Sequence, residues 1–390
     1  MLKTTQTSNF RRVAIIHYWL VGMRGGERVL ESLCKMFPNA DIFTHVVEHH
    51  QLSDLLQKHT IKTTFIDRLP FAKKLYQSYL PLMPMALEGL DLSDYDLVIS
   101  SEAGPAKGVV VPPGVPHVCY CHSPMRYLWD QYSIYRKNAG TVTRLAMPWI
   151  AHKMRLWDVT SAARVDHFVA NSNHVANRIE KYYRRDAAVV APPVAVSDFS
   201  PVPLEQIGDF YLWAGELAPY KRPDLAIEAF NRSGRKLVVI GGPAKTVEEL
   251  RRKAKPNVTF LGKAPFPVLK DHMARCRGLI FPGEEDFGIV PVEVMASGRP
   301  VVAFAKGGAL DTVIDGLSGI LFPEQSVESM NEAIDRMEEW IQRGELDVDA
   351  IRQHAERFSE ANFQQAMMNE ISSALESLRP NRILGSCLAT

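Results

Sequence analysis

Short apolar runs alternate with amphipathic stretches along most of this chain. The first run, Val13–Ile16, leads into a glycine-rich turn, and residues 29–36 then carry apolar side chains at helical spacing. Repetition of strand, turn and helix predicts a parallel sheet covered by helices, an α/β fold. Further strands are predicted at residues 40–47, 95–100, 108–111, 117–121 and 166–170, and a further helix at 175–183.

A proline-rich segment, residues 190–206, interrupts this pattern, which is typical of a linker between domains. We therefore predict two doubly wound domains, residues 1–200 and 201–360, and a C-terminal helical segment over 361–390 that crosses back to the first domain. Such sheets bind ligands beyond the carboxyl ends of their strands, so we expect a site in a cleft between the domains. The second half is predicted to hold strands at 211–214, 236–240, 258–261, 278–281 and 300–303, and helices at 223–231, 247–253, 267–275, 291–297, 310–313, 326–343, 348–358 and 361–378.

The composition is that of a globular protein and restricts the possible partners. The 390 residues are 46% hydrophobic, and no apolar run reaches the roughly 18 residues of a membrane span. The net charge of +1 conceals a basic first half, with 23 Lys/Arg against 17 Asp/Glu in residues 1–200, and an acidic second half. No compact Lys/Arg block of the kind that binds nucleic acid occurs. The five cysteines are odd in number and widely spaced, which favours a reducing cytoplasm.

The strongest chemical signal is an acidic stretch, residues 282–293, that follows a predicted strand and opens a helix. Free backbone N–H groups and the helix dipole at such a place favour a polar or anionic ligand. Glu285 on the loop and Glu293 inside the helix can act together, as acceptors for sugar or ribose hydroxyls. The same acids can equally serve as helix-capping residues that interact with the dipole.

This stretch, continuing to residue 302, resembles the E-x7-E signature of glycosyltransferase family 4, whose members are retaining nucleotide-sugar transferases. Residues 306–308 and 315–316 match the usual continuation, and residues 213–225 match the start of the family's C-terminal domain. The resemblance covers most of the chain and is strongest over residues 211–322. It implies the GT-B fold, in which two Rossmann-like domains face a central cleft.

The resemblance also implies a donor site in the second domain. Glu293 would accept hydrogen bonds from the ribose, Glu285 would bind hydroxyls of the transferred sugar, and Lys221 would neutralise the diphosphate. The family commonly has an arginine, a second diphosphate ligand, where this chain has Glu216, so Arg222 is the candidate substitute. The remaining donor-binding positions that we carry over are Gly25, Gly26, Gly262, Lys263, Asp286, Phe287, Gly288 and Ile289.

The first half carries further candidates. The glycine-rich turn of residues 22–27 allows close approach of the backbone to a phosphate, although tight strand–helix turns use glycine in any case. His117, Cys119 and Cys121 share one face of a predicted strand and suggest a metal site, but no second Cys/His pair with zinc-site spacing follows. The simpler interpretation of His117, Cys119 and Cys121 is that they are buried core residues.

Residues 171–173 are predicted to cap a helix, and the same residues could contact a phosphate or the acceptor.

Residues 121–129 resemble a subgroup of bacterial family 4 enzymes that transfer mannose to surface-polysaccharide precursors. In this comparison His122 would touch the transferred sugar, so we place it with Glu285 and Lys221 as a catalytic candidate. Arg24, Arg126 and Tyr127 would line the acceptor side.

We therefore expect a hexosyltransferase that moves mannose from GDP-mannose, with retention, to a polyprenyl-diphosphate-linked saccharide in O-antigen or lipopolysaccharide biosynthesis. We expect no metal or other cofactor, because Lys221, Arg222 and backbone amides would neutralise the phosphate charge.

Basic and aromatic residues interleave over 71–82 and 145–157. This pattern fits docking on the anionic inner face of the cytoplasmic membrane, and it fits core-facing helices with solvated lysines equally well. The alternatives are another GDP- or UDP-sugar, a same-fold epimerase or phosphorylase, and a non-catalytic nucleotide-binding partner.

Overall fold

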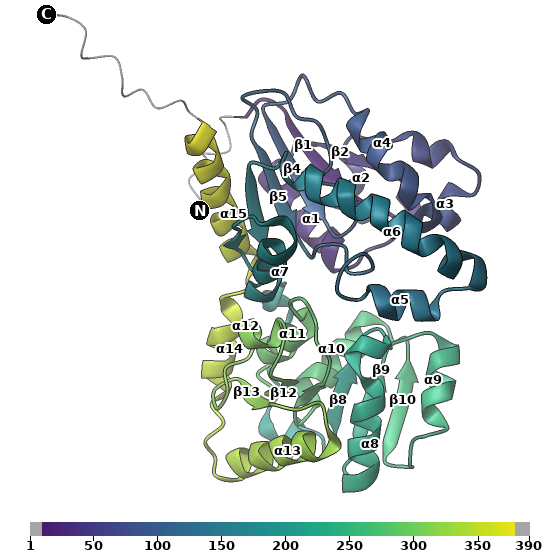
Figure 1. The fold of residues 1–390 in the computed structure, drawn as a ribbon. Coiled ribbons are helices and arrows are strands. Elements are labelled where there is room, and N and C mark those ends of the chain that lie inside the picture. The colour runs from purple at the N-terminus through teal and green to yellow at the C-terminus, as the bar shows by residue number, and fades with distance from the viewer. Residues whose placement is uncertain (1–9, 379–390) are drawn as a thin grey trace, which may run out of the picture. The chain divides into compact units, whose positions relative to one another are not determined.

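The computed structural model describes residues 10–378, so Cys387 and the predicted segment beyond Leu378 lie outside the described residues. The chain divides into two compact units. Unit 1 contains the described residues up to Val190 together with those from Gln364, and unit 2 contains Ala191–Phe363. Each unit holds a parallel sheet with helices packed on it, as the alternating pattern predicts (Figure 1).

Unit 1 is built on a seven-stranded sheet in the order β3-β2-β1-β4-β5-β6-β7. The residues of its inner strands are buried, which explains their continuous apolar runs. The strands are β1 (Val13–His17), β2 (Asp41–Thr44), β3 (Ile61–Thr63), β4 (Leu97–Glu102), β5 (His117–Cys121), β6 (His167–Ala170) and β7 (Ala188–Val189). The helices are α1 (Gly25–Met36), α2 (Asp54–Gln57), α3 (Ala72–Leu75), α4 (Met83–Glu88), α5 (Tyr132–Asn138), α6 (Thr141–Ala162) and α7 (Asn173–Tyr183).

Unit 2 is built on a six-stranded sheet in the order β10-β9-β8-β11-β12-β13. The strands are β8 (Tyr211–Ala214), β9 (Leu237–Ile240), β10 (Val258–Gly262), β11 (Leu279–Phe281), β12 (Val301–Phe304) and β13 (Gly319–Phe322). The helices are α8 (Pro223–Ser233), α9 (Ala244–Arg251), α10 (Phe266–Arg275), α11 (Ile289–Ala296), α12 (Ala309–Thr312), α13 (Val327–Gln342) and α14 (Val348–Glu356).

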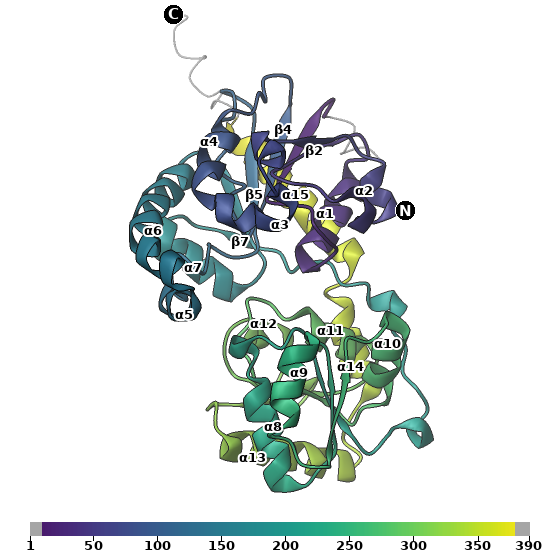
Figure 2. The ribbon, with the colours of Figure 1, turned by 90° about the vertical axis from the view of Figure 1, so that its right-hand side faces the viewer.

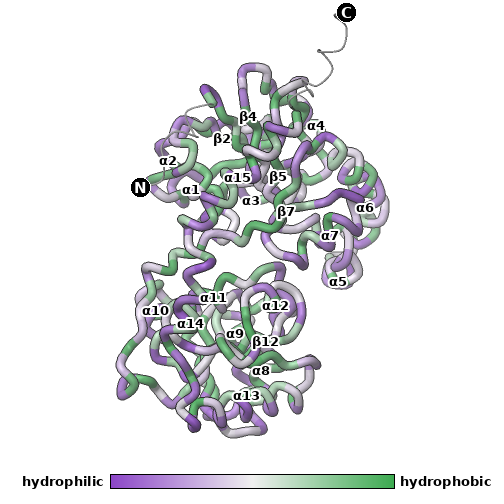
Figure 3. The backbone as a smooth tube through the Cα atoms, turned by 90° about the vertical axis from the view of Figure 1, so that its left-hand side faces the viewer, coloured by the Kyte–Doolittle hydropathy of each residue, from purple (hydrophilic) through white to green (hydrophobic). Residues whose placement is uncertain are grey.

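Each unit has its own apolar interior. In unit 2, one cluster of buried side chains extends from the strands β8, β11 and β12 to the helices α8, α11 and α13. In unit 1, smaller clusters lie around β1 and β4 and around β5, β6 and α7. Figure 3 shows the corresponding hydrophobic stretches along the tube. None of the helices within residues 10–378 is long and apolar enough to cross a membrane.

Two sequence-based expectations differ from the structure for reasons of packing. The prediction of a strand at residues 108–111 is wrong, because this apolar segment packs against α6 instead of pairing with another strand. Val109 is fully buried, and a Cβ on Gly108 would lie 2.0 Å from Trp157 Cζ2. The boundary between the units falls at Val190 rather than at residue 200, since Phe199 is already part of the core of unit 2.

The last described helix, α15 (Glu360–Leu378), belongs to unit 1 from Gln364 onwards (Figure 2). Gln364 Nε2 donates a hydrogen bond to Ser32 Oγ on α1, at 3.3 Å. Further along, His167 Nε2 lies 2.8 Å from Glu370 Oε2. Met367, Met368, Ile371 and Ala374 of α15 are buried, so this helix contributes to the interior of unit 1.

Candidate active site

The acidic loop of unit 2 lies at the carboxyl edge of its sheet, between β11 and α11. Lys221 Nζ lies 2.9 Å from Glu285 Oε1, and the side chains remain 15% and 17% exposed. Lys221 ends a short 3-10 helix, η7 (Pro219–Lys221), that follows β8. Because β8 and β11 are parallel neighbours, their outgoing connections meet at one edge and bring the base and the acid together.

The loop that follows β12 holds the backbone of Glu285 in place. The amide of Gly308 donates a hydrogen bond to the carbonyl of Glu285, at 2.8 Å. A Cβ on Gly308 would lie only 2.3 Å from Phe287 Cα, so the two backbones can approach this closely only at a glycine. Lys306 Nζ lies 3.1 Å from Glu284 Oε2 beside this contact. The acidic loop is therefore fixed by backbone packing on the side of β12.

Glu293 lies in the second turn of α11 and is buried. The first amides of a helix have no partner within it, and those of α11 lie between Glu285 and Glu293 in the sequence. One short segment thus combines two carboxylates with amides suited to an anion. Among the other predicted donor positions on this segment, Phe287 and Gly288 are buried, whereas Asp286 and Ile289 are partly exposed.

Arg222 already has a partner of the opposite charge. Its backbone is left-handed, with φ of 52°, immediately before α8. Its Nε and Nη2 donate hydrogen bonds to the carboxylate of Asp224 at 3.0 to 3.1 Å. A diphosphate would therefore compete with Asp224 for this guanidinium. Glu216, which the resemblance aligns with an arginine common in the family, is exposed.

The loop predicted to frame the nucleotide base follows β10. The carbonyl of Gly262 accepts a hydrogen bond from the amide of Gly241, at 2.7 Å, which ties the ends of β9 and β10 together. The next residue, Lys263, is exposed. Because β10, β9, β8 and β11 are parallel, these residues lie at the same sheet edge as Glu285.

In unit 1, a series of polar groups crosses the carboxyl edge of the sheet. Ser101 Oγ, on β4, lies 3.1 Å from His17 Nδ1 and 2.9 Å from His122 Nε2. His17 Nε2 lies 3.8 Å from Glu27 Oε1, and Glu27 Oε2 accepts the backbone N–H of Arg24 at 2.9 Å. The predicted glycine-rich turn and the predicted sugar-contacting His122 are thus connected through His17 and Ser101.

His17 and Ser101 were not predicted from the sequence, although a polar residue at the end of an apolar strand indicates a position of this kind. Burial lowers the pKa of His122 to about 3, with a further decrease from His17 and an opposing effect of Glu27. Burial alone would raise the pKa of Glu27, but hydrogen bonding and the charge of His17 hold it below its usual value. At neutral pH, Glu27 is therefore a carboxylate and His122 a neutral imidazole that can exchange hydrogen bonds with a hydroxyl.

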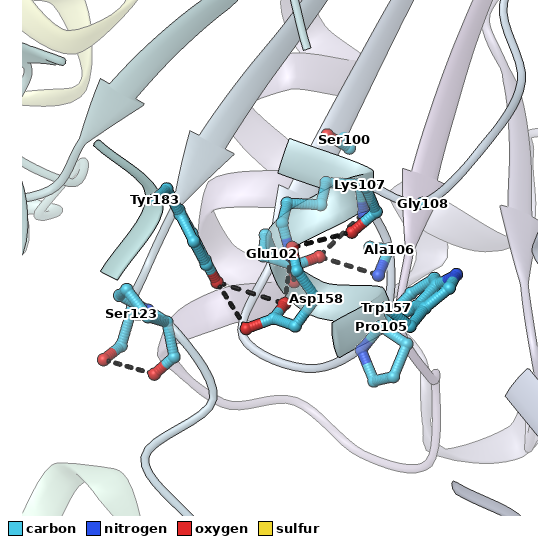
Figure 4. Close-up of polar contacts among 12 residues, drawn as sticks. Ser100, Glu102, Pro105, Ala106, Lys107, Gly108, Ser123, Trp157, Asp158 and Tyr183 are labelled. Carbon is cyan, nitrogen blue, oxygen red and sulfur yellow. Dashed lines mark hydrogen bonds and ion pairs between the residues drawn. The ribbon is translucent and has the colours of Figure 1, made fainter. Parts of the chain in front are cut away.

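A second polar cluster of unit 1 is completely buried (Figure 4). Lys107 Nζ pairs with Asp158 Oδ1 and lies 3.3 Å from Glu102 Oε1. Asp158 Oδ2 also accepts hydrogen bonds from Trp129 Nε1, at 2.8 Å, and from the hydroxyl of Tyr183, at 3.0 Å. Burial opposes the charge of Lys107, but the two carboxylates raise its pKa above the usual value, so this lysine stays charged. Local spacing gives no signal for the complete cluster, since Asp158 lies 51 residues from Lys107 in the sequence.

The buried cluster holds the loop of residues 123–131 through Trp129. Within this loop, Tyr127 packs against the apolar cluster that contains Met125 and Met154, and its hydroxyl is buried. Arg126 is partly exposed. Tyr127 is partly exposed as well, and Arg126 Nη1 is buried like the hydroxyl of Tyr127. The two residues, which the resemblance places on the acceptor side, therefore do not differ in accessibility class.

The two cysteines of β5 are packed in the interior of unit 1. Cys119 and Cys121 belong to an apolar cluster with Phe168, and His117 Nε2 lies 2.9 Å from Ser100 Oγ. Between residues 10 and 378, no three His, Cys, Asp or Glu side chains gather in a way that could hold a metal ion. Ser172 caps α7, because its Oγ accepts the amide of Val175 at 3.1 Å.

Two family profiles match consecutive parts of the chain. The profile described as Glycosyltransferase Family 4 matches residues 23–197, and the profile described as Glycosyl transferases group 1 matches residues 198–356. The chain belongs to glycosyltransferase family 4. The two matched regions meet between residues 197 and 198, close to the boundary between the two units at Val190.

The relatives of this family 4 chain are distant. D-inositol 3-phosphate glycosyltransferase of Jonesia denitrificans is 31% identical over 189 residues, which are 40% of this chain and 45% of that protein. The chain spans about half the length of the curated relatives it matches.

Two solved structures share the architecture of this family 4 chain. The structure of Anabaena HepE in complex with UDP and glucose matches 92% of this chain and 99% of its own, with a TM-score of 0.69 and 18% identity. WaaG, a glycosyltransferase involved in lipopolysaccharide biosynthesis, matches 92% of this chain and 99% of its own, with a TM-score of 0.61 and 17% identity. At these identities the likeness concerns the fold, and the fold is GT-B.

Proposed function

We propose that this chain is a retaining glycosyltransferase that moves a hexose from a nucleotide sugar to an acceptor hydroxyl. The observation that carries the proposal is the partly exposed Lys221–Glu285 pair at the loop before α11, close in sequence to the buried Glu293. In this proposal Glu293 accepts the ribose hydroxyls and Glu285 orients hydroxyls of the hexose. Lys221 exchanges part of its contact with Glu285 for a contact with the donor diphosphate.

The reaction breaks the bond between the anomeric carbon and a diphosphate oxygen and forms a bond from that carbon to the acceptor oxygen. The acceptor approaches on the face of the leaving group, and the departing phosphate oxygen takes its proton, so retention needs no carboxylate nucleophile. Lys221 and the first amides of α11 stabilise the negative charge that develops on the leaving group. Arg222 joins them when it leaves Asp224, and His122 contributes a neutral imidazole toward a hexose hydroxyl.

We further propose GDP-mannose as the donor and a polyprenyl-diphosphate-linked saccharide of surface-polysaccharide biosynthesis as the acceptor. The support is the resemblance of residues 121–129 to a mannose-transferring subgroup. The Anabaena structure holds UDP and glucose, so UDP-sugars belong in the same test.

The full chain is incubated with a panel of GDP- and UDP-sugars and a synthetic lipid-linked saccharide, and the products are weighed by mass spectrometry. We expect one hexose to be added from GDP-mannose. Product from a UDP-sugar alone would correct the donor, and conversion of the donor without acceptor would favour an epimerase. No product from any donor would contradict the proposed activity.

We also propose that unit 1 docks on an anionic membrane surface through α6. Val142, Leu145 and Trp149 are exposed, and their spacing places them on one face of the helix. Arg144 and Lys153 are exposed on the same helix. Apolar side chains flanked by bases bind both the acyl boundary and the anionic headgroups.

Co-flotation with phosphatidylglycerol vesicles tests this docking. We expect co-flotation that decreases with added salt and with Trp149→Ala, and that persists when Leu204, an exposed apolar residue of unit 2, is replaced by Ala. Equal flotation with neutral phosphatidylcholine vesicles, or none with either, would contradict the proposal.

A further inference from the structure

Unit 1 contains a pocket that the donor site does not use. Its volume is about 630 Å³, which is within the usual range for small-ligand pockets. Its walls come from the glycine-rich turn before α1, the segment after β2, and the chain from residue 67 to residue 76. The residues that matter for its chemistry are Arg24, Glu48, Asp67, Phe71, Lys74 and Tyr76.

One carboxylate in the wall of this pocket lacks a donor. Asp67 Oδ1 is buried and has no hydrogen-bond partner among the described residues. A buried oxygen without a partner is uncommon in folded proteins, because its lost hydration is not replaced. A ligand hydroxyl donated to Asp67 from the pocket would satisfy it. Glu48, in the same wall, adds a second carboxylate.

The aromatic part of the pocket is held in an unusual way. Phe71 has a left-handed backbone, with φ of 54°, and its side chain is 75% exposed. A residue with a Cβ adopts this conformation only at a cost, and such positions are concentrated at functional sites. Tyr76 packs against Trp19, with ring centroids 4.8 Å apart. Phe71 and Tyr76 thereby offer aromatic surface to a ligand in the pocket.

The pocket also carries positive charge at its edge. Arg24 and Lys74 are exposed, and neither forms an ion pair within residues 10–378. Lys73 is different, since its Nζ lies 3.6 Å from Glu48 Oε1. The backbone N–H of Arg24 is fixed by Glu27, so the start of α1 places this arginine at the wall of the pocket.

We propose that this pocket binds a glycosyl phosphate or diphosphate, the head of the acceptor; this inference rests on the proposed transferase function. Carboxylates accept sugar hydroxyls, and aromatic faces pack against the C–H face of a sugar ring. Arg24 and Lys74 bind the phosphate, as exposed cations do. Free phosphate alone fits less well, because Asp67 and Glu48 repel it, and a neutral sugar leaves the two cations without a counter-charge.

The position of the pocket agrees with this role. Trp19, which packs against Tyr76, also packs against Tyr18, and the rings of Tyr18 and His17 lie tilted against each other with centroids 4.2 Å apart. His17 is joined to His122 through Ser101. A continuous series of side chains within unit 1 therefore connects the pocket to the residue proposed to contact the transferred hexose.

Binding is measured by ligand-observed NMR on the full chain with saturating GDP and UDP, so that the donor site is filled whichever of the two nucleotides it takes. The probes are α-D-mannose 1-phosphate, N-acetyl-α-D-glucosamine 1-phosphate, methyl α-D-mannoside and inorganic phosphate. We expect at least one sugar phosphate to bind more tightly than the methyl mannoside and inorganic phosphate. Asp67→Asn should weaken that binding about tenfold, since a hydrogen bond to a charged group is lost. The matched control is Asp186→Asn, at an exposed carboxylate of the same unit, which should leave binding unchanged.

A second variant keeps the test valid if Asp67→Asn affects folding. Lys74→Ala, at an exposed position, should weaken sugar-phosphate binding several-fold and leave the methyl mannoside unaffected. The inference is overturned if the unchanged chain, Asp67→Asn and Lys74→Ala bind the sugar phosphates with equal affinity. It is also overturned if inorganic phosphate binds more tightly than the sugar phosphates.

Transfer assays separate this inference from the proposed function. If the pocket holds the acceptor, Asp67→Asn raises the acceptor KM and leaves the donor KM unchanged. Transfer with an unaltered acceptor KM would refute the pocket and retain the transferase. Sugar-phosphate binding without transfer from any donor would refute the transferase and retain the pocket.

Discussion

Two lysine–carboxylate groups of this chain use the same chemistry under opposite conditions. In unit 1, Lys107 and its two carboxylates are fully buried and share hydrogen bonds with Trp129 and Tyr183. In unit 2, the pair of Lys221 and Glu285 lies at a sheet edge and remains partly open to solvent. The first group cannot exchange a partner without exposing a buried charge, whereas the second can. Burial, rather than residue type, therefore separates a structural ion cluster from a site suited to a charged substrate.

The largest expected effect is on stability. Asp158→Ala removes one of the two carboxylates that pair with the buried Lys107. Because the lysine charge is then only partly compensated, we expect the free energy of unfolding to fall by about 3–5 kcal/mol. Urea denaturation followed by circular dichroism measures this change. Glu228→Ala, which removes a partner from the exposed Arg232, is the control and should have no measurable effect. A similar loss of stability in both variants would show that burial does not distinguish the two kinds of ion pair.

The next effect is on catalysis. Glu285→Ala should lower the rate of transfer by about 10²–10³-fold, because an oriented polar contact to the reacting sugar is lost. Nucleotide binding, followed by calorimetry, and the urea midpoint should remain close to those of the unchanged chain. Near-normal turnover would remove Glu285 from the site, and a large loss of stability would show that this pair resembles the buried cluster after all.

The pH dependence of stability tests two histidines of unit 1, His117 and His122, whose pKa values are lowered in the folded chain. Burial lowers the pKa of His117 to about 4 and that of His122 to about 3. The unfolded chain takes up these protons near pH 6.5, so stability falls on acidification below that pH, by up to about 1.4 kcal/mol per pH unit for each histidine. Urea midpoints between pH 7 and 5 measure the slope, and His117→Gln should make it shallower. A slope that His117→Gln leaves unchanged would contradict this assignment.

The smallest effect sharpens the comparison with a third polar group. Ser101→Ala removes the contacts of Ser101 with both His17 and His122. We expect kcat to fall about tenfold with an unchanged donor KM, because His122, proposed to contact the hexose, loses one hydrogen bond. Ser101→Thr should restore most of the rate. Ser100→Ala is the matched control, because Ser100 contacts His117 instead. Equal losses in the Ser100 and Ser101 variants would indicate a general effect on β4.

Much of the fold could be predicted from the sequence, because strands buried on both faces produce short apolar runs between amphipathic helices. The acidic stretch around Glu285 was equally visible, since its residues are consecutive. The segment around Val109 was misjudged because packing against α6 requires the same apolar residues as pairing in a sheet. The apolar residues 108–111 alone do not indicate whether the segment pairs in a sheet or packs against a helix.

The parts of the site that depend on distant contacts could not be predicted. Lys107 and Asp158 are 51 residues apart, and no local pattern joins them. The ion pair of Arg222 with Asp224 was overlooked for a different reason: the left-handed backbone at Arg222 turns the two side chains together. The lack of a hydrogen-bond partner for the buried Asp67 Oδ1 can likewise be recognised only from the three-dimensional structure.

Helix α15 has a consequence for the order in which the chain assembles. Unit 2 is continuous in sequence, whereas unit 1 takes its last segment from beyond residue 363. During synthesis, all residues of unit 2 are available before unit 1 can bury the apolar side chains of α15. A chain cut after Phe363 would therefore lose more than a tail, because the first-made half would be left with an uncovered surface.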